Sequence, residues 1–300
     1  MSEPVIAMIF DFDDTLAPDS ISHLLRRELR FTDEQVKAFW DETTALVTDG
    51  WDPPIAYLSQ LLDLVRHRRL SLTKAKLRSI GAELKPFDGL PELFPQLRDM
   101  VNRKKEFVDA GVRFQFYVIS GGLEEVIRGN PIRDEMAGIF GCTFRHDKET
   151  DEPTEIRSAI SFTEKTRFLF GIHKGFSERE LRATPYVVND AMKNERPTDR
   201  PIPLDQMIYL GDGPSDIPCF SVVKEGEGNA IGIRKPRGDE GKISKGFEMA
   251  RGERTTQGPY KADYRPGTDM REAIEDSILD IAYKIVVRRR ERRVEGPSFD

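Results

Sequence analysis

Three acidic side chains follow the first apolar segment of the chain. The stretch "IFDFDDTL" places Asp11, Asp13 and Asp14 directly behind the apolar run "VIAMIF". That run, from Pro4 to Phe10, is typical of a buried parallel strand because it is short, apolar and rich in β-branched and aromatic residues. Carboxylates crowded at a strand end repel one another and resist burial. A bound cation, or a chemical task that needs the carboxylates, must therefore hold them there.

Three other groups of polar residues also end apolar segments or begin helices. The segment "VRFQFYVISGG" predicts a second strand that ends at Ser120 and Gly121, and "TEKTRFLFGIHKG" predicts a helix with Lys165 in its first turn. The segment "LDQMIYLGDG" predicts another strand, followed by Asp212 and Asp216. Taken singly, these groups have ordinary explanations: a strand-to-helix turn, a surface lysine and a tight turn.

The order of the predicted elements indicates an α/β fold. Strands and helices alternate, with polar residues at the strand ends, which predicts a doubly wound parallel sheet whose site lies outside the carboxyl ends of the strands. From about Ser20 to about Leu84 the spacing is helical, interrupted by "DGWDPP". We therefore expect a Rossmann-like core of residues 1–18 and 85–300, with residues 19–84 inserted as an α-helical cap.

Other segments of the core give weaker signals. Short strands are expected in "AGIFGCTFRHD", "IRSAISF" and "GNAIGI", with "KETDEPTE" as a polar connector. Residues 176–203 predict an irregular or partly helical excursion, and residues 235–258 predict a mobile polar loop. Residues 271–293 predict an amphipathic helix whose basic end faces solvent.

Composition narrows the class of protein. The chain has 300 residues, 38% of them hydrophobic, and a net charge of -6, which argues against binding to nucleic acid or a membrane surface by bulk electrostatics. No apolar run is long enough to cross a bilayer, and the first residues lack the features of a signal peptide. We expect a cytoplasmic protein in which Cys142 and Cys219 are partly buried thiols outside the mechanism. Oligomeric state stays open.

Taken together and in order, the four polar groups resemble the motifs of the haloacid dehalogenase superfamily of phosphohydrolases. That pattern is D-x-D-x-[T/V], a strand-end Ser or Thr, a Lys, and an acidic motif of the G-D-x-x-x-D kind. The resemblance covers the core from about Val5 to Ile233 and leaves out the helical insert. It implies a phosphatase or a phosphotransferase that uses Mg²⁺ and an aspartyl-phosphate intermediate.

The resemblance assigns a role to each motif. Asp11 is the nucleophile, and Asp13 is the acid that protonates the leaving alcohol and the base that later activates water. Ser120, with the amides of Gly121 and its neighbour, binds phosphate oxygens, and Lys165 binds the same group. The implied Mg²⁺ ligands are a carboxylate oxygen of Asp11, the backbone carbonyl of Asp13, and the carboxylates of Asp212 and Asp216.

Some assignments stay open from the sequence. Lys174 also precedes the last motif, but it fits a helix C-terminus, whereas Lys165 follows a predicted strand by a short turn. We expect Asp14 to face solvent or cap a turn, and Thr15 to brace the loop through a hydrogen bond. The phosphoserine phosphatases are the most similar subgroup, yet they place a substrate-reading Glu where this chain has Ser20, which disfavours free phosphoserine as substrate.

Residues near the entrance of the expected cap are candidates for reading the substrate. These are Asp19, Ser20 and His23, with a helix N-cap as the preferred role for Ser20. The dehalogenating relatives lack the second aspartate and ion-pumping relatives carry Thr there, so Asp13 favours phosphoryl chemistry on a small phosphorylated metabolite. The alternative from another class is a binding or regulatory protein that keeps an inactive phosphatase core.

Overall fold

A single mixed sheet organises the described part of the chain, which is residues 4–189, 200–234 and 254–294 of this computed structural model. Neighbouring strands pair in the order β4-β3-β2-β1-β5-β6-β7, and every pairing is parallel except β3 with β4. The strands are β1 (Val5–Phe10), β2 (Arg113–Leu123), β3 (Gly138–His146), β4 (Pro153–Ser158), β5 (Met207–Gly211), β6 (Asn229–Arg234) and β7 (Gln257–Lys261).

The direction of winding reverses at β1. From β1 the chain first builds outward through β2, β3 and β4, and it then returns to the other side of β1 for β5, β6 and β7. Ligands of doubly wound sheets bind outside the carboxyl ends of the strands at such a switch point. The predicted α/β fold is confirmed, and the acidic motif after β1 lies at this point.

Strand β1 is buried on both faces, as its unbroken apolar sequence predicts. Ile6, Met8 and Phe10 pack into one hydrophobic cluster, whereas Ala7 and Ile9 pack into the other. All five are 0% exposed. Successive side chains of a strand point to opposite faces, so one short run anchors both layers of helices.

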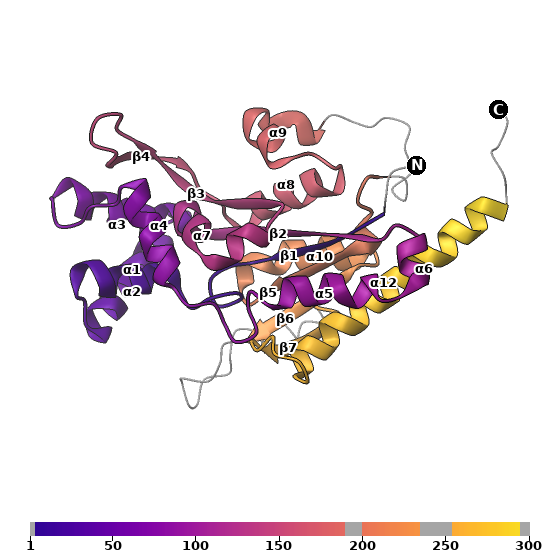
Figure 1. Cartoon of the computed structure of the whole chain (residues 1–300). Coiled ribbons are helices and arrows are strands. Elements are labelled where there is room, and N and C mark those ends of the chain that lie inside the picture. The colour runs from indigo at the N-terminus through magenta and orange to yellow at the C-terminus, as the bar shows by residue number, and fades with distance from the viewer. Residues whose placement is uncertain (1–3, 190–199, 235–253, 295–300) are drawn as a thin grey trace.

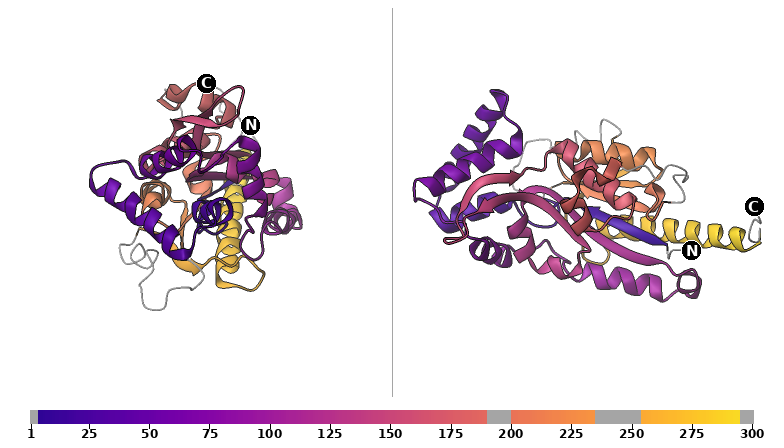
Figure 2. Two further views of the ribbon diagram at one scale, coloured as in Figure 1. Left: turned by 90° about the vertical axis from the view of Figure 1, so that its left-hand side faces the viewer. Right: turned by 90° about the horizontal axis from the view of Figure 1, so that it is seen from above.

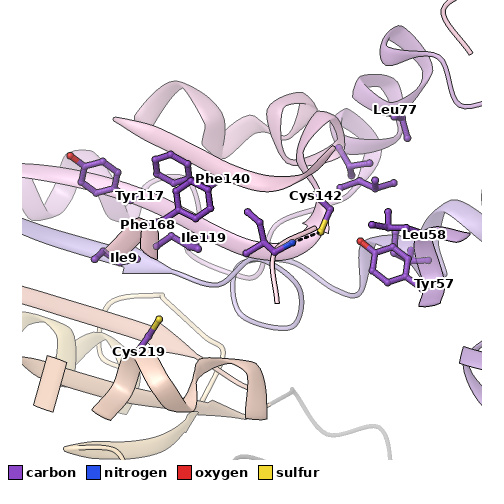
Figure 3. Close-up of a cluster of buried hydrophobic side chains, with 14 of the residues drawn as sticks. Ile9, Tyr57, Leu58, Leu77, Tyr117, Ile119, Phe140, Cys142, Phe168 and Cys219 are labelled. Atoms are coloured by element: carbon purple, nitrogen blue, oxygen red, sulfur yellow. Dashed lines mark hydrogen bonds between the residues drawn. The ribbon is translucent and has the colours of Figure 1, made fainter. Parts of the chain in front are cut away.

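Helices cover both faces of the sheet (Figure 1). One layer holds α5 (Leu93–Asn102), α6 (Lys105–Asp109) and α12 (Asp269–Val294), and the other holds α8 (Phe162–His173) and α10 (Ile217–Glu225). The rings of Phe140 on β3 and Phe168 on α8 stack with centroids 4.3 Å apart (Figure 3). None of the helices in the described ranges combines the length and the apolar character that a bilayer crossing requires.

The helical insert lies beyond one end of the sheet (Figures 1 and 2). The N-cap of its first helix is Asp19, whose carboxylate accepts hydrogen bonds from the backbone N–H groups of Ile21 and Ser22. The N-cap role expected for Ser20 is therefore wrong, because Ser20 is already the first helical residue. The helices are α1 (Ser20–Leu29), α2 (Asp33–Thr48), α3 (Pro53–Arg66) and α4 (Lys74–Glu83).

Three segments differ from the sequence-based expectation. Strand β4 begins at Pro153 and ends at Ser158, so it takes in part of the expected connector and omits the end of "IRSAISF". Strand β7 includes residues 257–258, which we had expected in a loop; residues 235–253 of that loop lie outside the described part of the chain. The excursion at 176–203 contains α9 (Glu178–Ala183) and the 3-10 turn η2 (Pro185–Asn189), and residues 190–199 are not described.

The turn between β3 and β4 is attached to the segment that enters α4. The Glu152 carboxylate accepts hydrogen bonds from the hydroxyl of Ser71 at 2.5 Å and from the backbone N–H of Leu72 at 2.9 Å. The Asp151 carboxylate accepts one from the backbone N–H of Lys74 at 2.9 Å. These charged partners explain why the acidic segment pairs as a strand, since its turn is held against the inserted helices.

Helix α4 is also packed closely against α7 (Glu124–Gly129). A Cβ on Gly81 would lie 1.9 Å from the carbonyl oxygen of Val126, and a Cβ on Gly129 would lie 2.0 Å from that of Arg78. The Asn130 side chain adds hydrogen bonds to backbone carbonyls at the end of α4. Glycine is required at this crossing because the two backbones approach too closely for any side chain.

We predict that Gly81→Ala destabilises the protein by about 3 kcal/mol, because the new methyl group meets backbone that has no room to move aside. Chemical unfolding followed by circular dichroism measures the change. Ala75→Ser, an exposed change on the same helix, is the control and should alter the free energy of unfolding by less than about 0.5 kcal/mol. Equal stability of the two variants would contradict the close crossing.

Candidate active site

A buried lysine joins two carboxylates at the carboxyl edge of the sheet. The Lys165 ammonium lies 2.9 Å from a carboxylate oxygen of Asp11 and 2.7 Å from one of Asp216. Lys165 is 1% exposed, Asp216 is 0% exposed and Asp11 is 7% exposed. The structure thus brings together residues from three of the four motifs.

Asp11 and Lys165 come to this edge from different elements of the fold. Asp11 is the first residue after β1, and its backbone N–H donates to the carbonyl of Leu210 on β5. Lys165 lies in the first turn of α8, which begins soon after β4 has returned antiparallel to β3. Lys174 is the C-cap of the same helix, where its ammonium donates to the Val188 carbonyl. The ion-paired lysine at this edge is therefore Lys165.

Asp216 is held by hydrogen bonds to both of its carboxylate oxygens. The Tyr209 hydroxyl donates to one oxygen at 2.8 Å, and the backbone N–H of Gly213 donates to the other at 3.1 Å. A Cβ on Gly211 would lie 2.4 Å from the Asp216 carboxyl carbon. The glycine that ends β5 therefore leaves the space in which Asp216 sits.

Three carboxylates converge closely enough to share a cation. Asp11, Asp212 and Asp216 each offer an oxygen, and these oxygens lie within 4.8 Å of one another. Oxygen donors of this kind suit a hard divalent cation. Asp13 was expected to contribute only its backbone carbonyl to the metal. Its side chain is not part of this carboxylate group, and it accepts a hydrogen bond from the backbone N–H of Ser20 at 2.8 Å.

Asp13 faces the Ser120–Gly122 segment from the loop that follows β1. A Cβ on Gly122 would lie 2.5 Å from an Asp13 carboxylate oxygen, so the Asp13 side chain packs directly against this glycine. Burial raises the pKa of Asp13 well above its ordinary value, and the negative charge of Asp19 adds to the rise. A carboxyl group with a raised pKa keeps its proton and can donate it.

The pKa values of Asp11 and Lys165 are both raised, for different reasons. Burial raises the pKa of Asp11 to about 6, although the positive charge of Lys165 opposes the rise. Burial by itself lowers the pKa of Lys165, but the carboxylates of Asp11 and Asp216 outweigh it and the pKa rises. Lys165 therefore stays charged at neutral pH, and Asp11 is ionised above pH 6.

The second motif lies within a strand. Strand β2 continues through Ser120 and Gly121 to Leu123, with an irregular register between Ile119 and Leu123. Beyond the irregularity β2 continues to pair with β3. Within it, the Ser120 hydroxyl accepts a hydrogen bond from the backbone N–H of Gly122 at 3.0 Å. The expected strand end at Ser120 is therefore a bulge.

Buried tyrosine hydroxyls contact three of the motifs, and the sequence analysis missed them. Tyr57 donates to the Gly121 carbonyl at 2.6 Å, and Tyr264 donates to the Thr15 carbonyl at 2.8 Å. Tyr209 donates to Asp216, as described above. Of these, only Tyr209 lies within a motif-bearing strand and had a signal in the sequence.

The loop that follows β1 is braced differently from our expectation. The Thr15 hydroxyl is buried and has no hydrogen-bond partner within the described ranges, so bracing through its side chain is wrong. The loop is held instead by the Thr15 carbonyl, which accepts from Tyr264. Asp14 adopts a left-handed conformation with φ 58°, and its backbone N–H donates to the Ala17 carbonyl.

We predict that Lys165→Met lowers the free energy of unfolding by about 3 kcal/mol at pH 8 in EDTA, because it leaves buried carboxylates without their cation. The decrease in the free energy of unfolding should be smaller at pH 5 than at pH 8. Without Lys165 the folded-state pKa of Asp11 lies further above its unfolded value, so stability present at low pH is lost as the pH rises through that pKa.

Urea unfolding at both pH values measures this dependence. Lys37→Met is the matched control, because Lys37 pairs with Asp41 at the surface with side chains 74% and 63% exposed. It should cost less than about 0.5 kcal/mol at either pH. A loss in Lys165→Met that is no larger than the control's, or that is greater at pH 5, would contradict the buried charge cluster.

Comparisons with known proteins bear on the fold. No family model matches this chain. A protein of Borreliella burgdorferi described as uncharacterized is 28% identical over 244 residues, which are 74% of this chain and 79% of that protein. A HAD family hydrolase from Salmonella enterica is 18% identical, with a TM-score of 0.49; the match covers 77% of this chain and 62% of that one.

Two solved structures of phosphoserine phosphatase match over nearly their whole length. A phospho-aspartyl intermediate analogue is 14% identical, covers 91% of this chain and 98% of that one, and has a TM-score of 0.50. A substrate-bound complex is 15% identical, covers 90% and 96%, and also has a TM-score of 0.50. The chain therefore has the haloacid dehalogenase fold that its motifs predict, in the form seen in the phosphoserine phosphatases.

Proposed function

We propose that this protein is a phosphatase of the haloacid dehalogenase superfamily that hydrolyses a small phosphomonoester through a phosphorylated Asp11. The observation that carries the proposal is the Lys165 ammonium held between Asp11 and Asp216 at the switch point of the sheet. A buried ammonium beside a carboxylate nucleophile offsets the negative charge that a phosphate group brings. The fold of the phosphoserine phosphatases supports the same reading.

The two aspartates of the first motif divide the reaction between them. A carboxylate oxygen of Asp11 forms the new bond to phosphorus, the bond from phosphorus to the ester oxygen breaks, and that oxygen takes the proton of Asp13. The carboxylate of Asp13 then removes a proton from water, which attacks phosphorus and releases Asp11 and inorganic phosphate. The raised pKa of Asp13 suits the first of these tasks.

The second motif and the lysine bind the transferred group. Ser120 and the backbone N–H of Gly122 lie on the side of the site that Asp13 faces. This N–H donates to the Ser120 hydroxyl at 3.0 Å, and in the proposed complex it is a donor for a phosphate oxygen. Lys165, 2.9 Å from the Asp11 carboxylate, supplies the positive charge.

The carboxylate group fits a Mg²⁺ ion. Asp11, Asp212 and Asp216 would hold it, with the backbone carbonyl of Asp13 as the further ligand that the resemblance implies. When bound, Mg²⁺ neutralises charge on the nucleophile and on the phosphate. The hydrogen bonds from Tyr209 and Gly213 fix the orientation of Asp216 for this role.

We propose further that residues 19–84 act as a cap which selects small substrates. Ser120 and Lys165 are each 1% exposed, so a substrate reaches them only when part of the covering structure moves. A closed cap excludes water and bulky substrates. Ser20 stands where the phosphoserine phosphatases carry a substrate-reading Glu, and we therefore propose a small phosphorylated metabolite other than free phosphoserine.

We predict that Asp11→Asn abolishes hydrolysis of p-nitrophenyl phosphate, and that Asp13→Asn spares aryl substrates relative to alkyl ones. Only a poor leaving group needs a proton as it departs. In single turnovers, Asp13→Asn should lose at least about tenfold more rate with an alkyl phosphate than with the aryl phosphate. Release of p-nitrophenol and of phosphate measures both.

Asp14→Asn is the matched control, since it removes a neighbouring carboxylate and asparagine tolerates the left-handed backbone at this position. It should retain most of the activity. Full activity of Asp11→Asn would disprove the proposed phosphatase mechanism. An inert wild type would favour a binding or regulatory protein, and transfer of phosphate to an added alcohol in preference to water would favour a phosphotransferase.

We also predict that binding of Mg²⁺ weakens as the pH falls below about 6. The pKa of Asp11 is raised to about 6, and the cation must displace that proton, so the affinity should fall about tenfold between pH 6 and pH 5. Isothermal titration calorimetry at pH 5 to 8 measures it, with Asp212→Asn as the control that binds weakly throughout. A constant affinity over this range would be inconsistent with the proposed site.

A further inference from the structure

We propose that Tyr57 is a positioning residue that couples closure of the inserted helices to the phosphate-binding segment Ser120–Gly122. The inference rests on the proposed phosphatase function and adds a specific contact to it. Tyr57 lies on α3, whereas Gly121 lies 64 residues later on β2. Their hydrogen bond is a direct link from the insert to a backbone group of the second motif.

The Gly121 carbonyl is held from two sides. The Tyr57 hydroxyl donates to it at 2.6 Å from the insert, and the Cys142 thiol donates to it at 3.1 Å from β3. Cys142 is itself fixed, since its sulfur accepts a hydrogen bond from the backbone N–H of Ile160. Figure 3 shows the Tyr57 hydroxyl directed towards Cys142. Tyr57 is 6% exposed, so little water competes for its hydroxyl.

Holding this carbonyl also sets the direction of the next N–H group. A peptide unit is planar, so the orientation of the Gly121 carbonyl determines that of the Gly122 N–H on its opposite side. That N–H lies 3.0 Å from the Ser120 hydroxyl, and Gly122 packs against the Asp13 carboxylate. Tyr57 therefore acts, through one peptide unit, on a donor beside both the phosphate site and the acid.

The hydrogen bond depends on the position of α3. Helix α4 is fixed to α7 through the glycine crossing at Gly81 and Gly129, whereas α3 contacts α2 and β4. The movement in this proposal is therefore one of α2 and α3 away from β4. When α3 moves away, Tyr57 leaves the Gly121 carbonyl while Cys142 remains. In the open state the Gly121 carbonyl keeps the hydrogen bond from Cys142, and on closure it regains the one from Tyr57. The peptide unit between Gly121 and Gly122 is therefore fully positioned only when the cap is closed.

The first test is the kinetics of Tyr57→Phe. Removal of one hydroxyl should lower kcat for p-nitrophenyl phosphate about tenfold and change KM by less than about twofold, since Lys165 and Ser120 still bind the phosphate. Tyr117→Phe is the matched control: its hydroxyl bonds to Gln115 on the same strand, away from the motif, and it is 7% exposed. Wild-type kcat in Tyr57→Phe, or equal losses in both variants, would overturn the proposal.

The second test needs no turnover. Trp40 lies on α2 with its ring centroid 6.1 Å from that of Tyr57, and the only other tryptophan of the chain is the exposed Trp51. In a Trp51→Phe background, inorganic phosphate with Mg²⁺ should change the Trp40 emission saturably as α3 closes. Adding Tyr57→Phe should reduce the amplitude at least threefold. An unchanged amplitude, or no response with Tyr57 present, would contradict coupling.

The two tests separate this inference from the proposed function. If the wild type is as inactive as Asp11→Asn, the phosphatase proposal fails, and the Trp40 emission still decides whether Tyr57 links α3 to a phosphate site. If the wild type is active and Tyr57→Phe matches it in both kcat and emission, the phosphatase proposal stands and the role of Tyr57 is wrong.

Discussion

The structure depends on one buried electrostatic arrangement, a lysine ammonium shared between two carboxylates at the carboxyl edge of the sheet. Lys165 makes the burial of Asp11 and Asp216 tolerable, because each carboxylate would otherwise lose its hydration without a compensating charge. The arrangement has a net negative charge even so, with Asp212 close by. This arrangement is the basis of our proposal that the site binds a cation together with an anionic group that pairs with the Lys165 ammonium.

The rest of the fold brings these charges together and keeps them there. Asp11 lies directly after the apolar strand β1, at the switch point of the sheet. Because β4 runs antiparallel to β3, helix α8 begins near the same edge and its first turn places Lys165 there. Hydroxyls of Tyr57, Tyr209 and Tyr264 each fix a different motif through a backbone carbonyl or a carboxylate. Aromatic residues suit this role because a large apolar body fills the core while a single polar atom reaches the site.

The sequence was sufficient for the fold and for the positions of the motifs, because both depend on local patterns. Alternation of apolar runs and helical spacing gave the doubly wound sheet, and polar residues after those runs marked its carboxyl edge. Contacts between distant segments had no such signal. The antiparallel β4, the bulge at Ser120 and the bond from Tyr264 to Thr15 all depend on tertiary pairing. The capping role of Asp19 was missed because Ser20 fits the same local preference.

The proposed mechanism requires that Asp11 carry the phosphoryl group during turnover. The most direct measurement is to quench the wild-type protein with acid during a reaction with phosphate-labelled substrate, digest it at low pH and locate the label by peptide mass spectrometry. We expect the label on the peptide that contains Asp11, and we expect mild alkaline treatment to remove it, because an acyl phosphate hydrolyses under these conditions. Label on Ser120, or phosphate release without any labelled peptide, would contradict it.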